Sequence, residues 1–479
     1  MQFMYTYMPR WMTERAIYLY IAVVLIASVL FAAYSISWYY MLFGVVEVVG
    51  FFYVSNKWTK EWSIDHMRDT TFANRLFYSS LIIRVVYVLF SYWFYTIMTG
   101  APMEFAAADS YFYHTSACEG ARLLREGILL DFWHNFNLYM GTDISDTGYA
   151  AYLSFVYFLT GDSILVSRLV KACWSALTVL LIYRLTERNF GQQTARMAGI
   201  FCMLMPNLIY YCGLQLKEVE MVFLTVLMVD MSDKMFRSRN FTAWQVIPVL
   251  LIGGMLFTIR TALAIVALLA ILFTIVMASD RVMGWGKRII IGLLAVMLIG
   301  VTVGNRIQEN ARELVESVQS RGQQTNMKWR AQRENGNKFA EYAGAAVFAP
   351  LIFTIPFPTV VNIPEQENQL VIHGGNFVKN VMSGLVILAM FSLLLTGNWR
   401  KCAMPLSFML GYLVVLVFSS FAQSERFHQP ALPFELLFAA YGISLVGKRE
   451  KRWFNYWVLF LFAVDIFWQW FKLAGRNMV

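Results

Sequence analysis

The sequence predicts an all-α polytopic membrane protein, and three observations lead to this fold class. Of the 479 residues, 58% are hydrophobic and 14% are charged, whereas a soluble domain carries about 25% charged residues. The apolar residues form runs long enough to cross a bilayer, which takes about 20 residues in a helix. Lys and Arg, which give a net charge of +9, gather in the short loops between these runs. That distribution is typical of residues that set membrane topology, not of a nucleic-acid-binding face.

About 13 transmembrane helices are predicted from these runs, several of them short. They lie near 16–36, 39–55, 76–98, 164–185, 193–212, 219–232, 243–259, 262–279, 289–304, 376–396, 403–421, 431–447 and 453–471. The first two form an N-terminal transmembrane hairpin within 1–60. Residues 61–479 are predicted to form one further transmembrane domain, because no linker interrupts them.

The basic loops predict the orientation of the helices. Arg10 and Arg15 place the N-terminus on the inner side, because positive residues favour the cytoplasmic face. Alternating the crossings from there places every dense basic cluster on that same face. The clusters lie within 57–75, 184–188, 234–239, 281–288, 400–401 and 448–452. This agreement supports the predicted number of crossings.

Two large loops then lie outside, at about 99–163 and 305–375. The first is acidic, and its stretches 116–127 and 149–159 are predicted to be helices in the outer interface. The second begins with a polar stretch rich in Arg, Gln and Glu. Its apolar part, 345–361, is interrupted by three prolines, which break regular helices. We therefore expect an interfacial or re-entrant piece there.

Asp109 is the first candidate for chemistry. It directly follows the third crossing, and an ionisable residue at the edge of a bilayer is a functional candidate by default. A single carboxylate in such a place can serve as a general base. The structural alternative is that Asp109 caps the helix that follows it, since Asp favours that position.

Three stretches together carry a family resemblance. The first is Asp109-Ser110-Tyr111-Phe112-Tyr113-His114. The second runs from Gly148-Tyr149-Ala150-Ala151-Tyr152 through Ser167-Arg168-Leu169 to Leu214-Gln215-Leu216-Lys217-Glu218. The third is Glu425-Arg426-Phe427-His428-Gln429-Pro430. In this order and on this side of the membrane, they resemble the GT-C superfamily of glycosyltransferases, in the branch of protein mannosyltransferases and lipid A aminoarabinose transferases.

The resemblance implies a GT-C-like fold with a catalytic domain over 61–479. It also implies a polyprenyl-phosphate-linked sugar donor, and a glycolipid, exopolysaccharide or protein that presents a hydroxyl acceptor outside the membrane. The expected place is the cell inner membrane, with the active site facing the periplasm or outside. The chain has Asp109-Ser110 where the family often has Asp-Glu. It also lacks the His-Pro-Pro-Leu-Tyr motif that the family often carries near Tyr149.

The candidate site residues follow from the resemblance and from the residue types. Asp109 is expected to be the base of an inverting transfer. Four cationic or titratable residues are expected near the donor phosphate: Arg260, Arg426, His428 and Lys217. Four others are expected to contact substrate: Glu218, Tyr113, His114 and Asp146. For the cations, snorkelling or local ion pairing is the structural alternative.

No cofactor and no metal ion are expected, because the five cysteines and five histidines show no metal-ligand spacing. Two other functions are compatible with a polytopic chain. One is an O-antigen or exopolysaccharide polymerase or ligase, which would use the arginines of 305–341. The other is a lipid-linked oligosaccharide flippase, although candidate charges at helix ends and the lack of an internal repeat are not typical of transporters.

Overall fold

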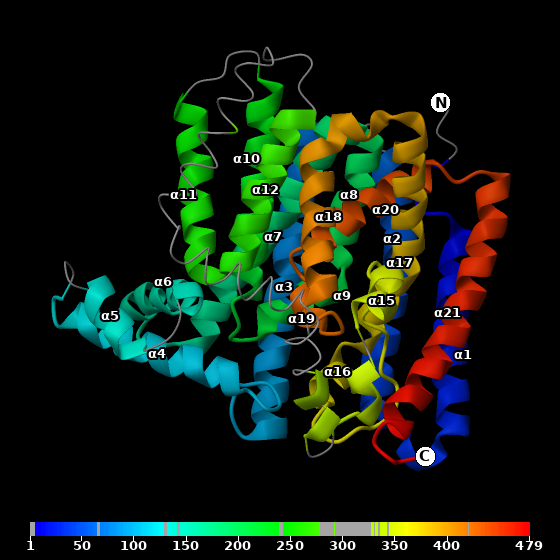
Figure 1. Cartoon of the computed structure of the whole chain (residues 1–479), viewed down its shortest axis with the longest axis horizontal. Helices are drawn as coiled ribbons and strands as arrows, with labels where there is room; N and C mark the ends of the chain where they lie inside the picture. The colour runs from blue at the N-terminus through cyan, green and yellow to red at the C-terminus, as the bar shows by residue number, and fades with distance from the viewer. Residues whose placement is uncertain are drawn as a thin grey trace.

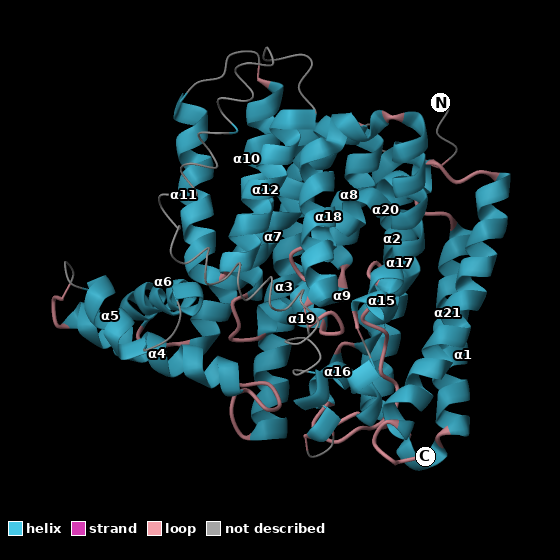
Figure 2. Cartoon of the chain, viewed as in Figure 1, coloured by secondary structure: helices cyan, strands magenta, loops and turns pink. Residues whose placement is uncertain are grey.

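The computed structural model describes residues 5–64, 68–128, 132–140, 144–238, 243–277, 292, 327–329, 331–333, 336–342, 344–419 and 421–479. All regular elements in these ranges are helices, joined by turns and loops (Figure 2). One isolated antiparallel bridge joins Ser35 to Val361. The all-α fold predicted from the sequence is therefore confirmed.

Most of the bundle helices correspond to the predicted crossings. They are α1 (Arg10–Leu30), α2 (Trp38–Ile64), α3 (Asp69–Thr99), α7 (Ile164–Phe190), α8 (Gln192–Leu204), α10 (Glu218–Arg237), α11 (Ala243–Ile259), α12 (Thr261–Met277), α17 (His373–Thr396), α18 (Ala403–Phe418), α20 (Leu432–Ser444) and α21 (Lys448–Ala474). The predicted crossing at 289–304 lies outside the described residues, apart from residue 292. The predicted crossing at 193–212 is broken, because Pro206 starts a separate short helix, α9 (Pro206–Tyr210).

Seven of these helices are long and apolar enough to cross a membrane, and three shorter ones are strongly apolar. The chain is therefore a multi-pass membrane protein. Figure 1 shows the bundle helices running side by side between two ends. At one end lie short basic loops, for example the one between α17 and α18. At the other end lie the two predicted outer loops.

The first outer loop projects sideways from the bundle as three helices (Figure 1). They are α4 (Ala108–Arg125), α5 (Phe132–Met140) and α6 (Ile144–Thr160), with α4 packed along α6. Gly100, with a φ of 78°, ends α3 and turns the chain into this loop. Ser163 ends the loop by accepting a hydrogen bond from the backbone N–H of Val166, which caps α7.

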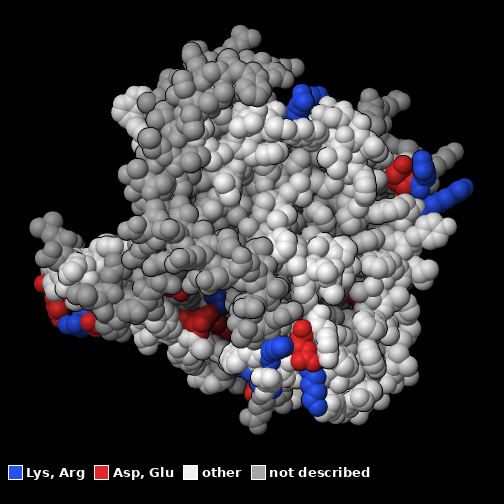
Figure 3. Space-filling view, in the orientation of Figure 1, with Lys and Arg blue, Asp and Glu red and all other residues white. Residues whose placement is uncertain are grey.

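The described part of the second outer loop contains short helices joined by irregular segments. The α-helices are α15 (Ala345–Phe348) and α16 (Glu367–Val371), and the stretch between them includes Val361, the residue of the isolated bridge. A short helix, α19 (Glu425–His428), lies between α18 and α20. In the space-filling view, described charged residues lie toward the upper edge and in the lower half of the molecule (Figure 3). The described surface between them is uncharged, as expected for a face in contact with lipid.

The N-terminal hairpin is packed into the bundle. Helix α1 contacts α2 and α21, and α2 contacts α8 and α17. Glu47 of α2 accepts a 2.9 Å hydrogen bond from the backbone N–H of Gly375 at the start of α17. The approach is close at Gly44, where a Cβ atom would lie 2.3 Å from Nε2 of His373. The hairpin is therefore joined to the helices that carry the rest of the outer surface.

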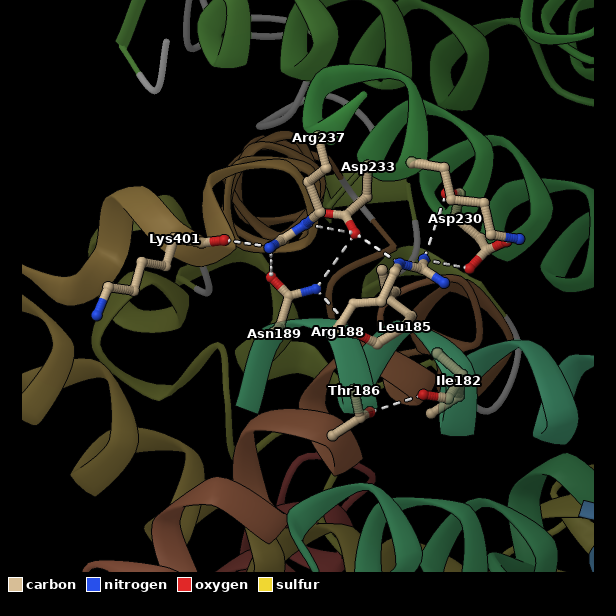
Figure 4. Close-up of polar contacts among 10 residues, drawn as sticks. Ile182, Leu185, Thr186, Arg188, Asn189, Asp230, Asp233, Arg237 and Lys401 are labelled. Carbon is tan, nitrogen blue, oxygen red and sulfur yellow. Dashed lines mark hydrogen bonds and ion pairs between the residues drawn. The ribbon is translucent and has the colours of Figure 1, made fainter. Parts of the chain in front are cut away.

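At the end of the bundle that is predicted to lie inside, ion pairs join α7 to α10 (Figure 4). Arg188 of α7 pairs with Asp230 and, at 3.1 Å, with Asp233 of α10. Arg237 pairs with Asp233 at 3.1 Å and donates a 2.6 Å hydrogen bond to the carbonyl of Lys401, before α18. We call Arg188, Asp230, Asp233 and Arg237 the inner clasp. The sequence predicted these arginines as topology determinants, and the structure shows that they also connect three helices.

Candidate active site

Three segments far apart in the sequence meet at Arg426, toward the end of the bundle that is predicted to lie outside. The guanidinium of Arg426 forms ion pairs with Asp109 through Nη1 and with Glu218 through Nε. Asp109 belongs to α4, Glu218 begins α10, and Arg426 lies in α19. The side chain of Asp109 is 58% exposed and that of Glu218 is fully buried. The cluster is therefore open to solvent at Asp109, and Glu218 is its buried anchor.

Asp109 lies in the first turn of α4, where the helix dipole favours a negative charge. The N-cap residue is Ala107, and no side chain caps the helix. Asp109 is therefore not the N-cap that was considered as an alternative. The neighbouring Ser110 turns the other way and donates a hydrogen bond to the buried carboxylate of Glu104.

Glu218 and Asp109 together hold Arg426 in its charged form. Burial by itself lowers the pKa of Arg426, but the attraction of the two carboxylates outweighs it and raises the pKa above its ordinary value. A guanidinium carries five N–H donors. Within the described residues, Nη2 of Arg426 has no hydrogen-bond acceptor. Its remaining donors can therefore bind a further anion.

His428 lies behind the site and not in it. Its side chain is buried, Nε2 donates to the carbonyl of Ala422 at 2.8 Å, and Nδ1 accepts from Nζ of Lys379 at 2.9 Å. Lys379 belongs to α17 and lies 3.7 Å from Glu435 of α20. His428 thus ties α19 to two bundle helices, and both of its ring nitrogens are occupied.

A second cluster lies where α6, α10 and α11 approach one another. Lys217 forms an ion pair with Asp146 and donates a 2.8 Å hydrogen bond to the carbonyl of Ile259. The hydroxyl of Tyr113 donates to the same carboxylate at 3.0 Å. Burial alone raises the pKa of Asp146, but the ammonium of Lys217 and the Tyr113 hydroxyl outweigh it and hold the pKa below its usual value.

Arg260 stands at the junction of α11 and α12, between the two clusters. Its guanidinium lies 4.1 Å from the ring centroid of Phe427, the residue next to Arg426. The preceding residue, Ile259, is the one that accepts from Lys217. Among the described residues, no carboxylate pairs with Arg260. The geometry thus gathers Arg260, Lys217 and Arg426 as three cations within one region.

His114 of α4 forms its hydrogen bond with α6. Its Nδ1 hydrogen-bonds to the hydroxyl of Tyr157 at 2.8 Å, and the burial of the ring lowers its pKa. Of the predicted substrate residues, Tyr113, Asp146 and Glu218 therefore join the two clusters, and His114 instead supports the packing of α4 on α6.

Sequence reasoning missed a buried layer of charge beneath the site. Arg168 and Lys171 of α7 are both fully buried, and Lys171 lies 3.7 Å from Glu220 of α10. Arg168 donates a 2.5 Å hydrogen bond to the carbonyl of Pro102, in the loop before α4. Their i and i+3 spacing in an otherwise apolar helix is the signal that could have found them, because it places both on one inward face.

The described residues contain no group of His, Cys, Asp and Glu side chains that could hold a metal ion. Most arginines on which a polymerase would depend lie outside the described residues: Arg306, Arg312, Arg321 and Arg330. Arg333 is described, and its guanidinium lies 5.2 Å from the ring of Trp329.

Comparison with known proteins supports the resemblance. The sequence pattern of the dolichyl-phosphate-mannose-protein mannosyltransferase family matches residues 148–304, about a third of the chain. The match includes Lys217, Glu218 and Arg260, and it does not include Asp109 or Arg426. No curated protein sequence matches the chain. The family match confirms the predicted likeness to the GT-C superfamily, and it supports a membrane glycosyltransferase that uses a polyprenyl-phosphate sugar as donor.

Proposed function

We propose that the protein transfers a sugar, with inversion, from a polyprenyl phosphate to a hydroxyl acceptor at the outer face of the inner membrane. Asp109 is the general base. The observation that carries this proposal is the position of Arg426, which joins the exposed carboxylate of Asp109 to the buried carboxylate of Glu218. One arginine thereby orients the base and offers further donors to a phosphate.

The chemistry requires one proton acceptor and several cations. The acceptor oxygen attacks the anomeric carbon while its proton passes to Asp109. The bond between the anomeric carbon and the phosphate oxygen breaks, and the electron pair leaves with the phosphate. Because the leaving group is already an anion, it needs positive charge and no general acid. A glycosidase, by contrast, commonly uses two carboxyl groups.

Arg426, Arg260 and Lys217 supply the positive charge in this proposal. Arginine binds phosphate in a bidentate manner, and the donors on Nη2 of Arg426 lie beside the base. Arg260 lies over Phe427, next to Arg426 in the chain. Lys217 is oriented by Asp146 and by the carbonyl of Ile259. A donor phosphate among these cations would present its sugar toward Asp109.

The other predicted site residues hold these groups in place. Glu218 fixes the guanidinium of Arg426 from the buried side. His428, predicted near the phosphate, holds α19 in place through Lys379. Tyr113 and Asp146 orient Lys217. His114 supports the packing of α4 on α6. The basic loops at the opposite end of the bundle support an outward-facing site.

The test is Asp109→Asn in purified protein, supplied with radiolabelled polyprenyl-phosphate sugars and acceptor membranes. Release of polyprenyl phosphate should fall about 10²- to 10⁴-fold, the usual contribution of a general base. Glu119→Gln is the matched control, because Glu119 lies on the same helix and pairs locally with Arg122. Transfer by Asp109→Asn at the rate of the control would refute the role of Asp109.

A further inference from the structure

A large apolar groove lies between the second outer loop and α21. Its volume is about 550 Å³, within the range typical of ligand pockets. Its walls are mainly aromatic, with Phe357 and Leu351 from the loop and Phe460, Phe467, Trp468 and Phe471 from α21. Among the described lining residues, the polar groups are the amide of Gln423, just before α19, the hydroxyl of Tyr342 and the indole N–H of Trp468. Such a lining suits a hydrocarbon chain.

A polar pocket of about 180 Å³ adjoins this groove. The two share Gln423, Trp468 and Phe471. The pocket adds Lys472 and Arg476 from the end of α21 and its following turn. The apolar space therefore passes directly into a space that carries positive charge.

No described carboxylate lies within ion-pair distance of the ammonium of Lys472, and Glu425 of α19 attracts it only from farther away. The ammonium donates to the hydroxyl of Thr359 at 2.7 Å, to Gln366 at 2.8 Å and to Gln369. These oxygens satisfy its hydrogen bonds but carry no negative charge. The side chain is 7% exposed, and a buried charge normally requires a partner of opposite sign. Among the described residues, no carboxylate forms an ion pair with Lys472, so the pocket is complementary to an anion.

The groove and the pocket together match the layout of a membrane lipid, because an apolar space is followed by a charged one. Phe460 lies near the middle of α21, and Lys472 lies near its outer end. In Figure 1, α21 runs along the bundle from the end with the basic loops to the end with the outer loops. A lipid chain in the groove would thus lie at bilayer depth, and its head group would reach the outer surface. Ser424 of the pocket is two residues from Arg426.

We propose that this groove and pocket bind the acceptor, a phosphate-bearing membrane lipid distinct from the polyprenyl donor. The inference rests on the proposed function, which already assigns Arg260, Arg426 and Lys217 to the donor phosphate. The second set of cations shares no residue with the first, and a bisubstrate enzyme needs a separate place for its acceptor. The enzyme would then glycosylate a lipid, and not a protein.

Photolabelling tests the binding without requiring catalysis. Full-length protein in phosphatidylcholine nanodiscs is exposed to phosphatidylglycerol or phosphatidylcholine, each with a diazirine in its acyl chain. The anionic probe should label the peptide around Phe467 about tenfold more than the zwitterionic probe, the effect of one charge-assisted hydrogen bond. Arg476→Gln should remove this preference. Arg452→Gln, at the inner end of the same helix, is the matched control.

Two labelling results would overturn the proposal. Equal labelling by both probes would show that the pocket does not select an anion. Displacement of the anionic probe by polyprenyl monophosphate would assign the groove to the donor carrier. Asp109→Asn should be labelled as the wild type is, because the base takes no part in lipid binding.

Product analysis tests the role of the lipid as acceptor. With a radiolabelled donor and a total lipid extract, the sugar should enter a lipid-soluble product other than the donor. Val464→Phe, which fills the groove, should raise the KM for the extract and leave the KM for the donor unchanged. Leu459→Phe, on the exposed face of α21, is the control. Sugar recovered only on protein would overturn the proposal, and no transfer to any fraction would contradict the proposed function while leaving the labelling result intact.

Discussion

Helix α10 carries a cluster of arginines and carboxylates at each of its ends, and the two clusters differ in how they are built. At the outer end, Glu218 meets Arg426 and Asp109, which come from remote segments. At the inner end, Asp230 and Asp233 meet Arg188 and the nearby Arg237. Both contain two carboxylates and at least one arginine, so composition alone does not distinguish them.

The difference lies in exposure and in unused hydrogen-bonding capacity. In the inner clasp, both carboxylates are nearly fully buried and each contacts two cations. In the outer cluster, Asp109 is mostly exposed, and Oε2 of Glu218 has no hydrogen-bond partner among the described residues. A closed cluster stabilises the fold, whereas an open one can exchange partners with a ligand. The following predictions test that distinction.

After Asp109→Asn, replacing Arg426 with Gln should have the largest effect on transfer. The change removes the cation shared by the base and the donor phosphate, so kcat should fall about 10²- to 10³-fold. Arg426→Lys should restore little, because an ammonium cannot reproduce the two-sided guanidinium contact. Single-turnover transfer assays measure this effect, and substantial recovery in Arg426→Lys would contradict it.

Replacing Arg188 with Ala should lower the stability of the protein and leave its transfer activity unchanged. Loss of Arg188 leaves Asp230 paired with Lys234 and Asp233 paired with Arg237. The free energy of unfolding should therefore fall by less than about 3–5 kcal/mol, the cost of an unpaired buried charge, and the melting temperature in detergent should fall with it. Transfer per folded molecule should stay near that of the wild type. Arg184→Ala, one turn earlier on the exposed face of α7, is the control. A specific loss of kcat in folded Arg188→Ala would show that the inner clasp is not purely structural.

Replacing Glu218 with Gln should cause an intermediate loss. Gln can still accept a hydrogen bond from Nε of Arg426, but the charge-assisted part of the contact is lost. We expect kcat to fall about tenfold, consistent with the value of one such bond. A loss as large as that of Asp109→Asn would indicate that Glu218, and not Asp109, is the base.

The ion pair of Lys217 and Asp146 predicts that the stability of the folded protein falls mildly at low pH. The pKa of Asp146 is lower in the folded protein than its usual value, so its contribution to stability is present above about pH 4. That contribution is lost as the pH falls through the folded pKa. Asp146→Asn should therefore flatten the lower limb of a plot of melting temperature against pH. An unchanged limb would assign the acid sensitivity to other carboxylates.

The smallest effect should follow from Arg122→Ala. Arg122 pairs with Glu119 and Glu126 on the surface of α4, and its side chain is 54% exposed. Exposed pairs contribute about 0–1 kcal/mol, so both the melting temperature and transfer should be nearly unchanged. A loss of transfer in this variant would extend the site along α4, beyond the first turn that carries Asp109.

The sequence predicted the crossings well because hydropathy is a local property. The runs that become α3, α7 and α17 are each recognisable without their neighbours. The break at Pro206 shows the limit of this reasoning, since residues 193–212 are mostly apolar and yet contain two separate helices, α8 and α9.

The candidate site was predicted only in part, because its contacts are long-range. Asp109 and Arg426 were singled out individually, but 317 positions separate them in the chain. The pairing of Lys217 with Asp146 and the burial of His428 depend on how α19 and α6 pack. Residue type and position at a helix end could not distinguish the exposed Asp109 from the enclosed His428.

The length of α10 has a consequence for inhibition. Its 20 residues span about 30 Å, so one stiff rod begins at Glu218 and ends at the inner clasp. A compound that bound at the inner clasp, on the side predicted to be cytoplasmic, and separated α7 from α10 would tilt this rod and withdraw the buried anchor of Arg426. The enzyme could then be inhibited from the side of the membrane opposite to its substrates, without competition from either of them.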